Sequence, residues 1–95
     1  MKARNKKMTT QLELKNQIAN LNKEIETLDL GSVIDWIEEN IIEVRENGIL
    51  TYSIGGPNIY INVYDELIEG YWGSDRVFKS CDTTVFKDYL ELFVA

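Results

Sequence analysis

The second half of the chain consists of short runs of β-branched and aromatic residues separated by turn residues. The four runs are ILTYSI, NIYINVY, LIEGYW and RVFKS, and they are separated in turn by GGP, DE and GSD. Short runs with this punctuation are typical of an antiparallel β-meander, here of four to five strands. Within NIYINVY, strand alternation puts Ile59, Ile61 and Val63 on one face of the sheet. We expect that face to be the core and the tyrosines of the same run to point outward.

Helical patterns flank the predicted sheet. A short second helix begins near DLGSVIDWIEEN, where Ser32 is a candidate N-cap and Asp35 its capping-box partner, with Glu38 and Glu39 facing water. Asp82 or Thr83 caps a final helix, TTVFKDYLELFVA, whose apolar stripe we expect to close the sheet. Residues 41–46 fit either a helix ending at Asn47-Gly48 or the first strand of a hairpin that turns there, and the alternation around Val44 favours the hairpin. The fold class predicted is α+β.

The first third of the chain carries an apolar repeat with coiled-coil spacing. We divide the chain into a flexible basic N-terminus (1–10), a helical arm (11–29) and a compact α+β domain (30–95). Along the arm, apolar residues recur at spacings of four and three. These residues, called the Ile/Leu stripe below, are Leu14, Ile18, Leu21, Ile25 and Leu28. The stripe either forms a homodimer seam in a short coiled coil or packs on its own domain, and we favour the homodimer.

Charge is segregated along the 95 residues. Residues 1–23 hold six basic residues and one acid, whereas residues 24–95 hold fifteen acids and four bases, for an overall net charge of −6. Direct nucleic-acid binding by the domain is disfavoured, because phosphate contacts need clustered Lys and Arg. An acidic domain suits a basic partner, although acidity also serves solubility alone.

The residue types present disfavour catalysis. The chain has no histidine and one cysteine, Cys81, so Ser-His-Asp and Cys-His systems, an internal disulfide and a cysteine metal cluster are excluded within one chain. Asp65, Glu66, Glu69, Asp75 and Asp82 are carboxylates that could bind a cation, but their spacing matches no calcium loop. We therefore expect no enzyme activity, no metal and no cofactor. The apolar runs are too short to cross a bilayer, so we expect a cytoplasmic protein.

The stretch from Ser53 to Arg76 concentrates glycine and aromatic residues. A tight reversal accounts for the GGPN residue types. The surplus of tyrosine and tryptophan nearby also has the composition of a protein interface. The predicted partner-binding residues are Gly55, Gly56, Pro57, Asn58, Tyr60, Asp65, Glu66, Tyr71, Trp72, Asp75 and Arg76.

GGPNIYIN, followed by GYWGSDR and a short acidic, aromatic final helix, resembles a family of small proteins encoded by bacterial phages, plasmids and conjugative elements. The resemblance covers about residues 30–95, and this chain departs from it at Asn62-Val63, where many members have Asp-Thr. Small acidic proteins of such elements look like anti-CRISPR proteins, some of which inhibit type II effectors of the Cas9 kind. The resemblance implies a non-enzymatic inhibitor that blocks a host nuclease.

Two further functions remain open at this point. One is a homodimeric accessory or regulatory protein of a plasmid or phage, whose basic N-termini contact DNA together. The other is a small-molecule binding domain that uses Tyr60, Tyr71 and Trp72 as a stacking platform.

Overall fold

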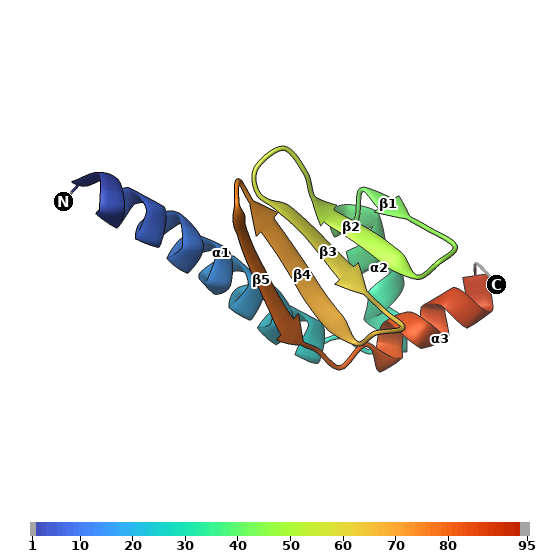
Figure 1. The fold of residues 1–95 in the computed structure, drawn as a ribbon. Helices are drawn as coiled ribbons and strands as arrows, with labels where there is room; N and C mark the ends of the chain where they lie inside the picture. The colour runs from blue at the N-terminus through green and yellow to red at the C-terminus, as the bar shows by residue number, and fades with distance from the viewer. Residues whose placement is uncertain (1, 94–95) are drawn as a thin grey trace.

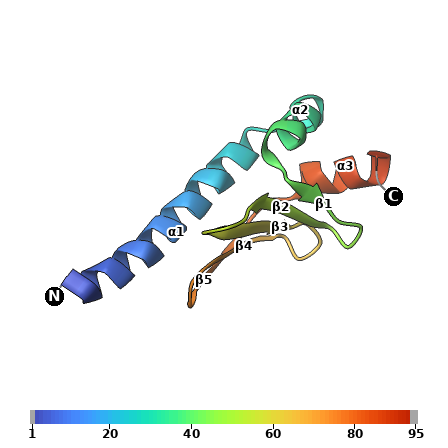
Figure 2. The same cartoon turned by 90° about the horizontal axis from the view of Figure 1, so that it is seen from above.

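A computed structural model describes residues 2–93, with the side chains of residues 10–93. Three helices and five strands follow one another along the chain, and the three helices lie on one side of the sheet (Figure 1, Figure 2). The elements are α1 (Lys2–Glu26), α2 (Leu30–Asn40), β1 (Glu43–Val44), β2 (Ile49–Ser53), β3 (Asn58–Asn62), β4 (Leu67–Trp72), β5 (Asp75–Ser80) and α3 (Thr84–Phe93). The α+β fold class is confirmed.

The sheet is a five-stranded antiparallel meander in the order β1-β2-β3-β4-β5. Ile59 and Ile61 have no exposed surface, as the alternation in their strand predicts. A β-bulge interrupts the β2–β3 pairing: Thr51 lies opposite Tyr60, whereas Ser53 lies opposite Ile59. The bulge ends regular pairing just before the GGPN loop.

The hairpin, rather than a continuing helix, occupies residues 41–53. The Gly48 amide donates to the carbonyl of Arg45 at 3.0 Å, and the Arg45 amide donates to the carbonyl of Ile49 at 3.0 Å. Gly48 has a φ of +83°, and a Cβ there would lie 2.5 Å from the Tyr64 ring. Glycine at this position therefore meets both a backbone and a packing requirement.

The Ile/Leu stripe is buried inside its own domain, and this corrects the prediction of a homodimer seam. Leu14, Ile18, Leu21 and Ile25 are at most 2 % exposed, and Leu28 packs partly buried against the same core. Helix α1 packs across β4 and β5. The heptad spacing marks a buried helix face, and the sheet rather than a second helix covers it.

Gly70 allows this close approach of α1 to β4. A Cβ at Gly70 would lie 2.5 Å from Ile18 Cδ1 and 2.9 Å from Leu14 Cδ1. The absence of a side chain in the middle of β4 leaves room for two residues of the stripe. A glycine within a strand often marks such an approach.

The observed helix α1 crosses the predicted boundary between the N-terminal tail (1–10) and the arm (11–29). Helix α1 begins at Lys2, so most of the stretch expected to be a flexible terminus is helical, and it ends at Glu26. The stripe residues of α1 belong to the same hydrophobic cluster as buried residues of the sheet, α2 and α3. The N-terminal part of α1 extends beyond β5, past the edge of the sheet (Figure 1, Figure 2).

Helix α2 begins one turn earlier than predicted. Asp29, not Ser32, is the N-cap: its carboxylate accepts from the Ser32 amide at 2.8 Å, while the Ser32 hydroxyl accepts from the Asp29 amide at 3.1 Å. Both residue types are good N-caps, and they stand three residues apart, so the sequence fits either start. Asp35 is not the box partner, whereas Glu38 and Glu39 are exposed as predicted.

Helix α3 anchors the core but shares the covering of the sheet with the other helices. Its Phe86 and Leu90 are buried, and it packs mainly against α2. Phe86 lies 5.7 Å from Trp36, centroid to centroid, and Trp36 stacks on Tyr52 of β2 at 6.1 Å. The Trp36 Nε1 group donates to Glu24 at 3.0 Å, so one side chain connects both other helices and the sheet.

The helix caps make the protein sensitive to acid. Hydrogen bonds from Ser32 lower the pKa of Asp29 below its ordinary 3.8, and hydrogen bonds from Thr84 lower the pKa of Asp82. Because the folded pKa values are depressed, this stabilisation is fully present above pH 3.8 and is lost as pH falls through the folded values. We expect Asp29→Asn to show a smaller loss of stability than wild type in urea unfolding between pH 5 and pH 3. Glu38→Gln, on the same helix and away from the cap, should follow wild type, and an equal loss for all three proteins would contradict the prediction.

Candidate protein-binding face

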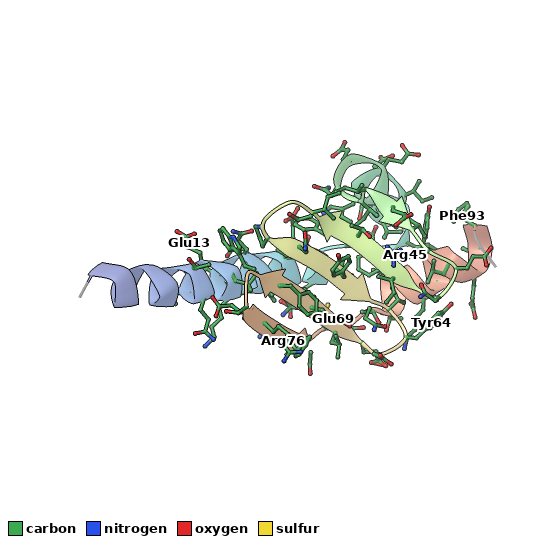
Figure 3. The ribbon with its side chains drawn as sticks, turned by 45° about the horizontal axis from the view of Figure 1, so that its top comes forward. Glu13, Arg45, Tyr64, Glu69, Arg76 and Phe93 are labelled. Carbon is green, nitrogen blue, oxygen red and sulfur yellow. The ribbon has the colours of Figure 1, made fainter. Side chains whose placement is uncertain are left out.

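The side of the sheet opposite the helices carries polar and aromatic side chains. We call it the open face, and its polar and aromatic residues on β3, β4 and β5 include Asn58, Tyr60, Asn62, Glu69, Tyr71, Arg76 and Phe78. The registers place these residues in neighbouring rows: Asn58, Tyr71 and Arg76 form one row, and Tyr60, Glu69 and Phe78 form the next. Glu69 and Arg76 project from β4 and β5 on this face (Figure 3). Among the described residues, all helix packing on the sheet comes from the other side.

Three aromatic rings, one each from β3, β4 and β5, contact one another in series across the open face. Tyr60 meets Tyr71 edge to face with centroids 6.1 Å apart, and Tyr71 meets Phe78 in the same way at 5.9 Å. Tyr60 and Tyr71 are half-buried, whereas Phe78 is 56 % exposed. Rings fixed by each other lose little side-chain entropy on binding, which is the reason aromatic residues dominate protein interfaces. We call Tyr60, Tyr71 and Phe78 the ring row.

A hydrogen-bond network holds Tyr71, the middle ring of the ring row, in place. Tyr71 donates to Glu69 Oε1 at 3.0 Å, and the Asn62 amide nitrogen donates to Glu69 Oε2 at 3.0 Å. The Asn62 side-chain nitrogen also donates to Asp65 Oδ2 at 3.0 Å, and the Asp65 backbone amide donates to Asn62 Oδ1 at 3.2 Å. These two bonds hold the β3–β4 turn. Burial, with the hydrogen bond and charge of Glu69, raises the pKa of Tyr71, so its hydroxyl remains a donor at neutral pH.

A hollow of about 400 Å³ continues the open face toward β1. It is lined by Ile42, Glu43, Arg45, Thr51, Ile54 and Tyr60. Ile42 and Ile54 are each 58 % exposed, and Arg45 pairs with Glu43 at 2.9 Å. Thr51 is only 4 % exposed, and its hydroxyl oxygen is buried with no hydrogen-bond partner among the described residues. The hollow thus offers apolar walls beside the ring row.

The GGPN loop closes one end of the open face. Gly55 and Gly56 have φ of +97° and +125°. The Gly55 amide donates to Asn58 Oδ1 at 2.9 Å, and the Ser53 hydroxyl donates to the Pro57 carbonyl at 2.8 Å. Pro57 is buried. These bonds account for the loop as a tight reversal, with the two exposed glycines at its tip.

The structure separates the predicted partner-binding residues into groups. Asn58, Tyr60, Tyr71 and Arg76 come together on the open face. Trp72 does not join them, because adjacent residues of a strand face opposite sides, and it packs partly buried against the core. A common stacking platform of Tyr60, Tyr71 and Trp72 is therefore wrong. Asp75 is paired with Trp72 and lies on the same face of the sheet as Trp72.

Asp65 and Glu66 lie at the other end of the sheet, in the β3–β4 turn. Glu66 has a φ of +57° and accepts from Lys87 of α3 at 2.9 Å. The GGPN loop and this turn lie at opposite ends of β3. Asp65 and Glu66 therefore cannot share one contact point with the loop. The predicted residues therefore divide among the GGPN loop, the acidic β3–β4 turn, the open face between them and, on the other face, Trp72 with Asp75.

Carboxylates gather around the end where Asp65 and Glu66 lie. Two hollows of about 500 and 520 Å³ share Glu26 and Asp82; the first also contains Asp29 and Asp88, and the second Asp65 and Glu66. Among residues 10–93, no group of three or more acidic or cysteine side chains is placed to hold a metal ion. Cys81 is buried beside this end, and burial with the charges of Asp82 and Glu26 raises its pKa to about 11.

Phe78 is the exposed aromatic residue of the open face that the sequence reasoning missed. The signal is present: a two-residue turn at Gly73-Ser74 pairs Trp72 with Asp75, and counting back along both strands brings Phe78 opposite Glu69. Phe78 then falls on the same face as Tyr71. The register of one hairpin was sufficient to find it.

None of the helices traced between residues 2 and 93 is both long and apolar enough to cross a membrane. Comparison of the chain with protein-family models, with curated proteins and with solved structures returned no match.

Proposed function

We propose that this chain is a non-enzymatic binding protein whose open face contacts another protein. The observation that carries the proposal is the ring row, with Phe78 56 % exposed on the helix-free side of the sheet. Fixed aromatic rings beside an apolar hollow and an arginine have the composition of interface hot spots.

The partner we propose is a basic, nucleic-acid-binding protein of the host, specifically a CRISPR effector nuclease of the Cas9 type. Two observations support this choice. Residues 24–95 are strongly acidic, and carboxylates concentrate around the two hollows at one end of the sheet. Such an effector holds its guide and target in a positively charged channel, where an acidic protein competes with nucleic acid. The resemblance to small proteins of mobile elements points to the same class.

Capture from a bacterial host tests the binding face. Tagged wild-type protein should retain a basic protein identified by mass spectrometry, and Phe78→Ala should reduce that capture about tenfold or more, as expected for an interface aromatic. Phe93→Ala is the matched control, since Phe93 is 57 % exposed on α3, away from the open face. Equal capture by both variants, with unchanged circular dichroism, would remove the open face as the contact.

A cleavage assay tests the identity of the partner. Purified protein is added to several Cas9 orthologues with their guides, before and after guide loading. Inhibition at near-stoichiometric ratio, weakened by Phe78→Ala and not by Phe93→Ala, is the expected result. Unaffected cleavage and guide loading at large excess would reject a nuclease inhibitor while leaving the binding face to be judged by the capture experiment.

A DNA-associated accessory role is the second candidate. The observation in its favour is that the N-terminal part of α1, whose sequence contains Lys2, Arg4, Lys6 and Lys7, extends past the sheet (Figure 1). Clustered bases on a projecting helix suit phosphate contacts. A salt-sensitive mobility shift of duplex DNA, lost on deletion of residues 2–7, would support this role in place of the first.

A further inference from the structure

The two edges of the sheet differ in the way they are protected. β1 has two residues, and an Arg45–Glu43 ion pair lies beside it. β5 has six residues, has no proline, and pairs with β4 alone among the described strands. A long edge strand presents unpaired backbone N–H and C=O groups to any chain that can add a strand.

The charges along β5 are complementary to those of β5 from a second, antiparallel copy of the chain. An antiparallel second copy that continues the same face of the sheet must pair even-numbered residues with even-numbered ones, because the side chains alternate. When Val77 lies opposite Val77 of the second copy, Asp75 lies opposite Lys79 of the second copy, and the reverse pair forms by symmetry. Arg76 then lies opposite Phe78 of the second copy, where a guanidinium meets an aromatic ring.

Other registers lose these pairs. A shift of two residues in one direction places Arg76 opposite Arg76, and a shift in the other leaves Asp75 opposite Cys81. Among residues 10–93 the ion pairs are Arg45–Glu43 and Lys87–Glu66, so Asp75, Arg76 and Lys79 have no ion-pair partner within that part of the chain. Like charges directly opposite one another destabilise a strand pair, whereas opposite charges stabilise it.

We infer that β5 is a self-association edge, through which two copies of this chain join their sheets into one of ten strands in the Val77–Val77 register. The contact is isologous, with a two-fold axis perpendicular to the sheet. Both α1 helices then lie antiparallel on one side of the joined sheet, and both ring rows lie on the other. The interface differs from the Ile/Leu stripe, which is buried within each chain.

Sedimentation equilibrium of the full chain tests the contact. Wild type should show a reversible monomer–dimer equilibrium, and Asp75→Lys and Lys79→Asp should each weaken it about tenfold or more, because two opposite-charge pairs become like-charge pairs. The Asp75→Lys/Lys79→Asp double variant restores both pairs with reversed sign and should restore the dimer. Circular dichroism of each variant monitors folding.

Amide hydrogen exchange supplies a second readout that charge effects on folding do not mimic. Amides along β5 should become more protected as wild-type concentration rises, and this increase should be absent in Lys79→Asp. A wild-type protein that remains monomeric at millimolar concentration overturns the inference. A dimer that is insensitive to the single swaps, or that the double swap does not restore, also overturns it. These results are independent of whether the open face binds a nuclease.

Discussion

Replacing Ile18 by alanine is expected to lower the free energy of unfolding by about 2–5 kcal/mol, the range for truncating a buried isoleucine or leucine. Ile18 has no exposed surface, and its Cδ1 lies against Gly70 in the middle of β4. Little can move in to fill the space, since the backbone of β4 is fixed by ladders on both sides. The loss should therefore fall toward the upper part of the range.

Leu12→Ala is the matched control for Ile18→Ala, because Leu12 lies on the same helix and is 58 % exposed. Its free energy of unfolding should stay within about 0.5 kcal/mol of the parent, as is usual for surface positions. Urea unfolding of both is measured in the Lys79→Asp background, so that the self-association proposed for β5 does not contribute. Similar small losses for the two variants would mean that the stripe of α1 does not pack on its own sheet.

Replacing Phe86 by alanine is expected to cost about 3–5 kcal/mol of unfolding free energy. Phe86 has no exposed surface and packs against Trp36, the residue that contacts Tyr52 and donates to Glu24. Truncation removes the ring that α3 places in the core and leaves a cavity beside the indole of Trp36. In a chain of 95 residues a loss of this size is a large fraction of typical domain stability.

Phe93→Ala provides the comparison for Phe86→Ala on the same helix, and it should change stability by about 0.5 kcal/mol or less. Thermal unfolding followed by tryptophan fluorescence reports on Trp36, which contacts Phe86, together with Trp72. The expected result is a large fall in midpoint for Phe86→Ala alone. If Phe86→Ala retained the wild-type midpoint, α3 would not be part of the cooperative core.

The sheet could be predicted because side chains alternate between the two faces of a strand, and only one face of this sheet is buried. Ile59 and Ile61 alternate with Tyr60 and Asn62, so a single run reveals which face is buried. Turn residues then fix where each strand stops. The same period also places Trp72 and Tyr71 on opposite faces, and the grouping of both into one binding surface ignored information that the sequence carried.

The packing of α1 could not be predicted from its own residues. A helix stripe with spacings of four and three is buried equally well by a second helix or by a sheet, because the spacing specifies the face and not its partner. The one hint lay in β4, where Gly70 interrupts an otherwise large-residue strand. The start of α2 was ambiguous for a similar reason, because Asp29 and Ser32 are both residue types that favour the N-cap position.

Gly70 has a consequence for how this chain can change over evolutionary time. Position 70 and positions 14 and 18 occupy one shared volume between β4 and α1, so they are not free to vary separately. A natural variant with alanine or serine at 70 should carry a shorter side chain at 14 or 18. Such compensation would identify true homologues of this protein more specifically than the glycines of the turns.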